Sequence, residues 1–260
     1  MTIVQSLWVG NKLTRLEIAS INSFIKTGHI FYLYTYEDVE GIPEGCVIQD
    51  ANLILDKEFL FEVKDSFLPF SDIWRYKLLS TVGGYWVDLD MIALKKFDFK
   101  EDYVISSERT MQSGTFKSKA LYTPNIGVLK GPPDSVFFKE AFNKCIRHLK
   151  KYRDNTDKLK YMKIFKKHII TWDFEKYVKT PEYFCNLDWW FCKEMYDIKP
   201  LKMKYNIEPR ADLLQGYSIH MWRHMSTTKY NKDLNATYDN NCLYEKILLS
   251  SNIDEEDPSE

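Results

Sequence analysis

Asp88 and Asp90 close a short apolar run that begins at Tyr85, and a single leucine separates them. If the run is a β-strand, its alternate side chains point to one side, so both carboxylates converge on one site just past the strand. Oxygen ligands of this kind suit Mg2+ or Mn2+ held against a diphosphate. Such a metal would neutralise charge on a leaving nucleoside diphosphate and ease the breaking of a sugar–phosphate bond. Because a D-x-D pair also occurs in ordinary turns, the prediction needs support from neighbouring residues.

Asp72 and Arg75 precede the D-x-D pair on a helix predicted over residues 71–82. Ser71 is its expected N-cap, and Gly83 and Gly84 end it before the strand begins. Because Asp72 and Arg75 are three residues apart, they share a helix face. A carboxylate and a guanidinium beside a metal–diphosphate site could bind sugar hydroxyls and phosphate. The competing interpretation is a surface salt bridge worth under about 1 kcal/mol.

Two runs carry a family resemblance: SDIWRYKLL at residues 71–79 and GGYWVDLD at residues 83–90. Together they resemble the D-x-D sugar-binding region of glycosyltransferase family 32, and they are similar to the glucosyltransferase domain of the large clostridial cytotoxins. The resemblance implies a catalytic set of Asp72, Arg75, Asp88 and Asp90. By this resemblance, Asp72 and Arg75 would bind the transferred sugar. Asp90 would contact the metal directly, and Asp88 would act through water or on the ribose and sugar. Trp86 would contact the donor, although the toxins have tyrosine there.

Leu7, Trp8 and Val9 resemble the family's first strand, which holds the nucleotide base, so the resemblance implies a donor-binding role for all three. An indole at a strand tip is a good stacking surface for uracil, whereas the competing interpretation is a core tryptophan. Asn125 resembles the family's asparagine on the strand after the D-x-D motif. Its amide would hydrogen-bond the transferred sugar, although taken alone it would be a turn residue.

The run SIHMW at residues 218–222 resembles the C-terminal H-x-W element of family 32. His220 would complete the metal shell with Asp88 and Asp90, or contact the diphosphate. Trp222 would bind the donor by closing over the phosphates as part of a mobile loop. A lone histidine in an apolar run is more often a satisfied core residue, and the H-x-W match is what favours the ligand role. The toxin domains carry a different residue at the position of His220.

Two segments bear on the acceptor, which the motifs leave open. Asp188 and Trp189 belong to an aromatic stretch, residues 180–196, that could line an acceptor-sugar site or form a buried helix anchoring a subdomain. Residues 139–167 contain eleven Lys or Arg against three Asp or Glu. Such a run is usually a solvated helix face, but it could also attract an anionic glycan, an acidic protein or a lipid headgroup. Peripheral membrane contact therefore stays open.

Composition limits the classes of function. The chain of 260 residues has a net charge of −1, which argues against bulk nucleic-acid binding. Its five cysteines form no C-x-x-C pair, a pattern that favours reduced thiols in a reducing compartment. The N-terminus shows no signal peptide, and no apolar run approaches the roughly 20 residues that span a bilayer. We therefore expect a cytoplasmic protein without a transmembrane segment.

The order of predicted elements indicates an α/β fold. A strand over 3–9, a helix capped by Thr14 and Glu17, and a strand over 30–35 form the opening of a parallel sheet. Further strands are predicted over 47–49, 85–89, 104–106, 126–129 and 217–222, and a helical pattern over 133–168. With the resemblance, this predicts one GT-A domain over residues 1–250: a Rossmann-like, mostly parallel central sheet flanked by helices, with a helical subdomain over 133–200. The acidic residues 251–260 are expected to be a disordered tail.

The sequence therefore predicts a metal-dependent glycosyltransferase that moves a sugar from a nucleotide-sugar donor to a glycan or protein acceptor, with Mn2+ or Mg2+ as cofactor. The region around Trp8 resembles UDP-using members more than GDP-mannose-using ones, and relatives retain the anomeric configuration, so a UDP-sugar and retention are expected. One alternative is a non-catalytic carbohydrate-binding or scaffold protein on the same fold. Another is a phosphatase of the haloacid dehalogenase type, which gives Asp72 and Arg75 no role.

Overall fold

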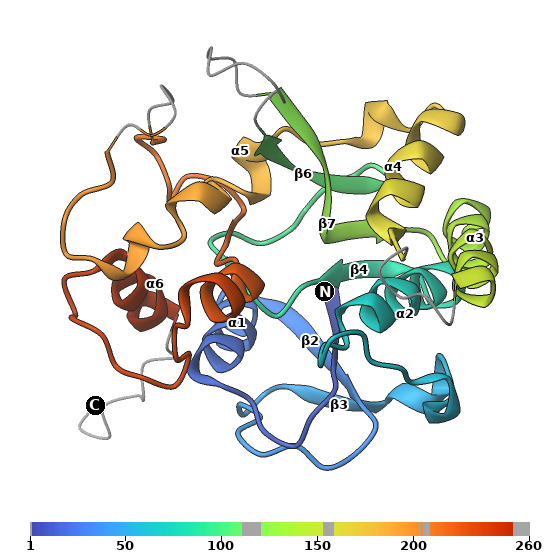
Figure 1. Ribbon diagram of the computed structural model, residues 1–260, viewed down its shortest axis with the longest axis horizontal. Coiled ribbons are helices and arrows are strands. Elements are labelled where there is room, and N and C mark those ends of the chain that lie inside the picture. Colours follow the sequence, from blue (N-terminus) through green and yellow to red (C-terminus); the bar gives the residue numbers. More distant parts are fainter. Residues whose placement is uncertain (1, 111–120, 153–158, 203, 205–208, 252–260) are drawn as a thin grey trace.

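The computed structural model describes residues 2–110, 121–152, 159–202, 204 and 209–251 (Figure 1). Six strands form one sheet in the order β3-β2-β1-β4-β7-β6. They are β1 (Thr2–Trp8), β2 (His29–Thr35), β3 (Val47–Asp50), β4 (Gly84–Val87), β6 (Val104–Thr110) and β7 (Leu121–Gly131). The first four run parallel, and β7 and β6 are antiparallel to their neighbours. The predicted α/β fold with a mostly parallel sheet is confirmed.

Helices cover both faces of this sheet (Figure 1). They are α1 (Arg15–Lys26), α2 (Leu68–Thr81), α3 (Val136–Tyr152), α4 (Tyr161–Thr171), α5 (Pro181–Phe184) and α6 (Leu243–Ser251). Helices α2, α3 and α4 share one core cluster with Trp86 and Leu129 of the sheet. Helix α1 packs on the opposite face, where its Ile21 and Phe24 meet Val4 and Phe31. The sheet is therefore buried on both sides, as parallel strands require.

The chain reverses direction across the sheet between β1 and β4. From β1 it adds β2 and then β3 on one side, and β4 returns to pair with the other side of β1. Such a switch in strand order leaves a crevice at the carboxyl ends of the two strands, where ligands of open α/β sheets bind. Here those ends are Trp8 of β1 and Val87 of β4, directly before Asp88.

Two predicted boundaries near this crevice are wrong. Helix α2 begins at Leu68 with Pro69 in its first turn, so Ser71 is a helical residue and not the N-cap. Proline fits there because the first helical N–H groups have no partner inside the helix. Strand β4 ends at Val87, so Asp88 and Asp90 do not alternate along a strand. They lie on a turn in which the Met91 N–H donates to the carbonyl of Asp88 at 3.1 Å.

The region after residue 133 is only partly as predicted. Helices α3 and α4 occupy its first part, but the aromatic stretch at 180–196 holds the short helix α5 and two 3-10 turns, Trp189–Phe191 and Glu194–Tyr196, in place of one longer helix. Strand β8 (Ser218–His220) pairs with β5 (Met91–Ala93) in a short two-stranded sheet. A strand was predicted at β8 but none at β5. The disordered tail predicted over 251–260 begins one residue too early, because Ser251 is the buried last residue of α6; residues 252–260 lie outside the described residues. Among those described, no helix is long and apolar enough to cross a membrane.

Candidate active site

A pocket of about 590 Å3 opens at the crevice between β1 and β4. It is bordered by the carboxyl ends of both strands, the start of α2, the first turn of α4 and the segment after β8. Nearly all predicted donor and metal residues line it: Leu7, Trp8, Val9, Asp72, Arg75, Trp86, Asp88, Asp90, His220 and Trp222. Tertiary structure thus brings together residues that are up to two hundred positions apart in the chain.

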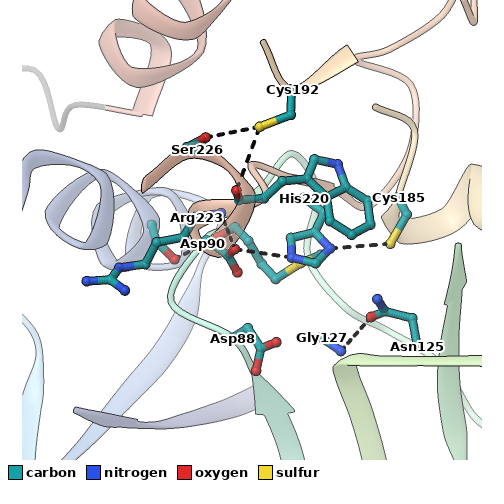
Figure 2. A network of polar contacts seen from close by, with 12 residues as sticks. Asp88, Asp90, Asn125, Gly127, Cys185, Cys192, His220, Arg223 and Ser226 are labelled. Atoms are coloured by element: carbon teal, nitrogen blue, oxygen red, sulfur yellow. Dashed lines mark hydrogen bonds and ion pairs between the residues drawn. The ribbon is translucent and has the colours of Figure 1, made fainter. Parts of the chain in front are cut away.

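Asp88, Asp90 and His220 form a cluster whose ligand atoms all lie within 4.8 Å of one another. Strand pairing creates it, because Met91 of β5 is paired with His220 of β8 in register. The Asp90 Oδ2 lies 3.2 Å from His220 Nε2 and accepts a hydrogen bond of 2.8 Å from the backbone N–H of Arg223 (Figure 2). The three residues of the predicted metal set therefore share one site.

Arg75 is the buried anchor of the site, with only 1% of its side chain exposed. Its Nη1 donates to Asp88 Oδ1 at 2.8 Å and to the carbonyl of Ile126 at 2.9 Å. Its Nε and Nη2 donate to the carbonyl and hydroxyl of Ser71, and Nη2 also lies 3.1 Å from Asp72 Oδ1. The burial excludes a mere surface salt bridge: the guanidinium fixes both carboxylates at the wall of the pocket.

Trp86 also acts on Asp88. Its indole N–H donates to Asp88 Oδ1 at 2.8 Å, and its ring lies 4.7 Å from the guanidinium carbon of Arg75. Asp88 Oδ1 therefore accepts two hydrogen bonds, while no described residue donates to its Oδ2. Asp90 is arranged in the same way, since both of its hydrogen bonds fall on Oδ2. One oxygen of each carboxylate stays available to a ligand.

Burial and neighbouring charges shift the pKa values of the ionisable side chains in the pocket. Burial raises the pKa of Asp72 to about 7, although Arg75 opposes the shift. Burial likewise raises the pKa of Asp88 against the pull of Arg75. At Asp90 burial acts in the same direction, but the charge and hydrogen bond of His220 outweigh it and lower the pKa. For His220 the attraction of Asp90 outweighs burial and raises the pKa well above its usual value.

The residues present fit a divalent cation. The pocket lining contains four aspartates and only two arginines: Asp65, Asp72, Asp88, Asp90, Arg75 and Arg223. When all four aspartates are ionised and both histidines are neutral, the state in which the site can hold a metal, this lining has a net charge of −2, which disfavours a bare diphosphate and favours a doubly charged cation. Two carboxylate oxygens and one imidazole nitrogen are ligands suited to Mn2+, and the oxygens also suit Mg2+. The binding of a metal would require His220 to release its proton.

Trp8 stands at the tip of β1 and is half-buried at the pocket wall, so it is not a core tryptophan. Its indole N–H is buried and has no hydrogen-bond partner among the residues that the structure describes. The guanidinium of Arg223 lies 5.4 Å from its ring, and Arg223 Nε donates to Glu17 Oε1 at 2.7 Å. Leu7 and Val9 flank the ring along the same lining.

Arg223 and Glu17 are site residues that the sequence reading missed. The capping box correctly placed Glu17 at the start of α1, where it accepts from the N–H of Thr14 at 2.9 Å. Nothing local in the sequence shows that its second oxygen reaches a residue more than two hundred positions later. Arg223 follows directly after the H-x-W element, which was the one available signal for it.

Trp222 stabilises the turn that places the backbone N–H of Arg223 within hydrogen-bond distance of Asp90. Its φ of 53° lies in the left-handed region, which a bulky residue occupies only when its surroundings enforce it. Two contacts do so: the ring stacks on His220 with centroids 3.9 Å apart, and the indole N–H donates to the carbonyl of Leu187 at 2.8 Å. The tryptophan is 8% exposed here and is packed beside the site at the edge of the pocket.

Asn125 lies next to the pocket but does not line it. Its Nδ2 donates to Glu108 Oε2 at 2.6 Å, and its Oδ1 accepts from the N–H of Gly127 at 2.6 Å. The carbonyl of Gly127 in turn accepts from the N–H of Asp88 at 2.8 Å. In this structure the amide holds Gly127 of β7, which in turn holds the backbone of Asp88, and a sugar contact stays a prediction.

Asp188 and Trp189 lie away from this pocket. Asp188 is buried and forms a two-point ion pair with Arg109, whose Nε donates to it at 2.6 Å. Trp189 packs edge-on against Trp190, and neither tryptophan lines the pocket. An acceptor role for the pair therefore stays a prediction, while the ion pair already gives Asp188 a structural partner.

Comparison with known proteins gives the family context of this geometry. Residues 18–111 match a family model described as "Glycosyltransferase sugar-binding region containing DXD motif". The match covers residues 18–111 only, and that part of the chain is similar to a glycosyltransferase sugar-binding region. The matched residues include Asp72, Arg75, Asp88 and Asp90, so the predicted resemblance and the prediction of a glycosyltransferase enzyme are confirmed.

One solved structure similar to this chain is titled "PaToxG Glycosyltransferase". The two share 13% sequence identity with a TM-score of 0.48, over 65% of this chain and 69% of the other. No curated protein matches the chain.

Proposed function

We propose that this glycosyltransferase transfers a sugar from a UDP-sugar to a glycan or protein acceptor, depends on Mn2+ or Mg2+, and retains the anomeric configuration. The observation that carries the proposal is the cluster of Asp88, Asp90 and His220 within 4.8 Å at the mouth of the β1–β4 crevice. The proposal treats residues 1–250 as one catalytic domain acting in the cytoplasm.

In this proposal Asp88, Asp90 and His220 hold the metal, which when bound supplies positive charge to the leaving diphosphate. Trp8 stacks on the uracil at the tip of β1, with Leu7 and Val9 beside it. The side chain of Arg223 is 41% exposed at this wall, so its free N–H groups can reach a phosphate oxygen. The base and diphosphate thereby span the pocket from Trp8 toward Asp90.

The sugar would lie against α2. Asp72 Oδ1 is buried and forms an ion pair with Arg75 Nη2 at 3.1 Å, but the geometry of that contact is not that of a hydrogen bond and no other described residue donates to it, so it can accept from a sugar hydroxyl. Arg75 keeps Asp72 and Asp88 in place, and Trp222 covers the phosphates. In the proposed reaction the acceptor hydroxyl attacks from the side of the leaving diphosphate as the sugar–phosphate bond breaks, and a phosphate oxygen of the leaving diphosphate takes the proton. This course retains the configuration and needs no opposing base.

A donor screen tests the proposal. Thermal unfolding and donor hydrolysis are measured with UDP- and GDP-sugars, each with and without Mn2+, and with Asp90→Asn as the control variant. We expect metal-dependent stabilisation and slow hydrolysis of one UDP-sugar by the wild type only. If no nucleotide binds in the presence of metal, the non-catalytic scaffold interpretation replaces this proposal.

A further inference from the structure

Helices α3 and α4 lie beside each other and present an unbalanced positive surface (Figure 1). Their exposed basic side chains, here called the basic face, are Lys139, Arg147, Lys150, Lys151, Lys160, Lys163 and Lys167. Residues 136–171 contain eleven Lys or Arg and three Asp or Glu, a net charge of +8. Since the whole chain carries −1, the remainder carries −9, so the charge of this protein is strongly segregated.

Within the part of the chain that the structure describes, the basic face is not neutralised by acidic side chains. Among the described residues, no basic side chain of α3 or α4 forms an ion pair, whereas lysines elsewhere do, as in Lys179–Glu101 and Lys204–Glu194. On α4, Lys160, Lys163 and Lys167 follow each other at helical spacing. Like charges three and four residues apart repel and destabilise a helix by a few tenths of a kcal/mol per pair. This repulsion between lysines lowers the stability of the helix, and a bound anion would reduce the repulsion.

The basic face continues to the rim of the active site. Met162, in the first turn of α4, lines the pocket beside Ile126 and Asp72. Lys163 follows Met162 directly and is exposed. An extended anionic chain that contacts α4 can therefore reach the pocket mouth without leaving the protein surface.

We propose that the basic face docks an acidic stretch of the polypeptide that accepts the sugar. This inference rests on the proposed transferase function, because it assigns that site an acceptor class. A helix that lies on a membrane inserts an exposed apolar face. Here most apolar residues of both helices, such as Phe137, Phe138 and Phe165, are buried in the core or packed against it. Of the described residues of α3 and α4, only Val136 and Ile170 are large apolar side chains that are exposed, which is little apolar surface for insertion and favours an acidic polypeptide over a lipid surface. Opposite charge also speeds encounter between such partners.

Binding of a fluorescent peptide of Glu and Gly, measured by anisotropy, tests the inference. The variant K160E/K163E/K167E reverses the charge of α4, and K139E/R147E/K150E does so on α3. The matched control K96E/K100E/K246E changes the net charge equally at exposed lysines elsewhere. We expect either helix variant to weaken binding at least about tenfold at about 50 mM salt, and the control less than about twofold.

Several outcomes overturn the inference. Equal weakening by the control variant would reduce the effect to net charge, and equal binding of a Gln–Gly peptide would remove the requirement for acid groups. Binding to phosphatidylserine vesicles but not to the peptide, lost in the helix variants, would assign the face to a membrane. Donor hydrolysis is expected to be unchanged in all variants. If even the wild type hydrolyses no donor, the proposed function fails, while charge-specific peptide binding would still support the basic face as a docking surface.

Discussion

Replacement of Arg75 by lysine tests whether the guanidinium organises the site. Its N–H groups make five contacts of 3.2 Å or less, to Ser71 (two), Asp72, Asp88 and Ile126. An ammonium group has three N–H groups and no fork geometry, so at least two of these buried acceptors lose their partner. At about 1–3 kcal/mol for each orphaned group, and more for a carboxylate, we expect Arg75→Lys to lower the free energy of unfolding by about 3–5 kcal/mol.

The measurement is urea unfolding at neutral pH without divalent metal, followed by far-UV circular dichroism. Arg210→Lys is the matched control, because Arg210 pairs with a Glu182 side chain that is 54% exposed. That pair is worth about 1 kcal/mol or less. If Arg75→Lys costs no more than the control, the five contacts do not hold the site together and the argument is refuted.

Three further outcomes are expected. Asp90→Asn removes the charge opposite His220, and we expect at least about a hundredfold loss of metal-dependent donor hydrolysis; unchanged turnover would exclude Asp90 as a ligand. Arg223→Met removes the exposed cation beside Trp8, and we expect the KM for the UDP-sugar to rise about five- to tenfold with a smaller change in kcat, whereas a pure kcat effect would contradict a binding role. Because the pKa of Asp72 is about 7 when folded and near 3.8 when unfolded, the folded state keeps its proton longer and stability falls as pH rises between these values. Asp72→Asn should flatten this decline in urea titrations from about pH 4 to 7, and an unaltered slope would place the titration elsewhere.

Much of the fold could be predicted because it depends on local patterns. Thr14 and Glu17 marked the start of α1, apolar runs marked β1 and β2, and the order of elements implied a parallel sheet. Boundaries were less accurate where the local signals were ambiguous or the element was short. Helix α2 starts before Ser71 because Leu68 and Pro69 can occupy its first turn, and β5 was missed because three residues carry too little periodicity.

The composition of the metal cluster could also be predicted, since the D-x-D and H-x-W motifs name Asp88, Asp90 and His220 directly. The stated reason for their convergence was wrong. The two aspartates meet through a tight turn and not through strand alternation, and β5–β8 pairing brings the histidine to them.

The amino-acid sequence by itself determined which side chains can perform the chemistry, because carboxylates, imidazole and indole act through their own atoms. Tertiary structure alone decided how each is held. Arg75 became a buried clamp on Ile126, Gly127 a support for Asp88, and Glu17 the partner of Arg223. Such contacts join residues tens to hundreds of positions apart, and no periodicity or spacing encodes them, since they arise only when the packed core fixes the distances between elements.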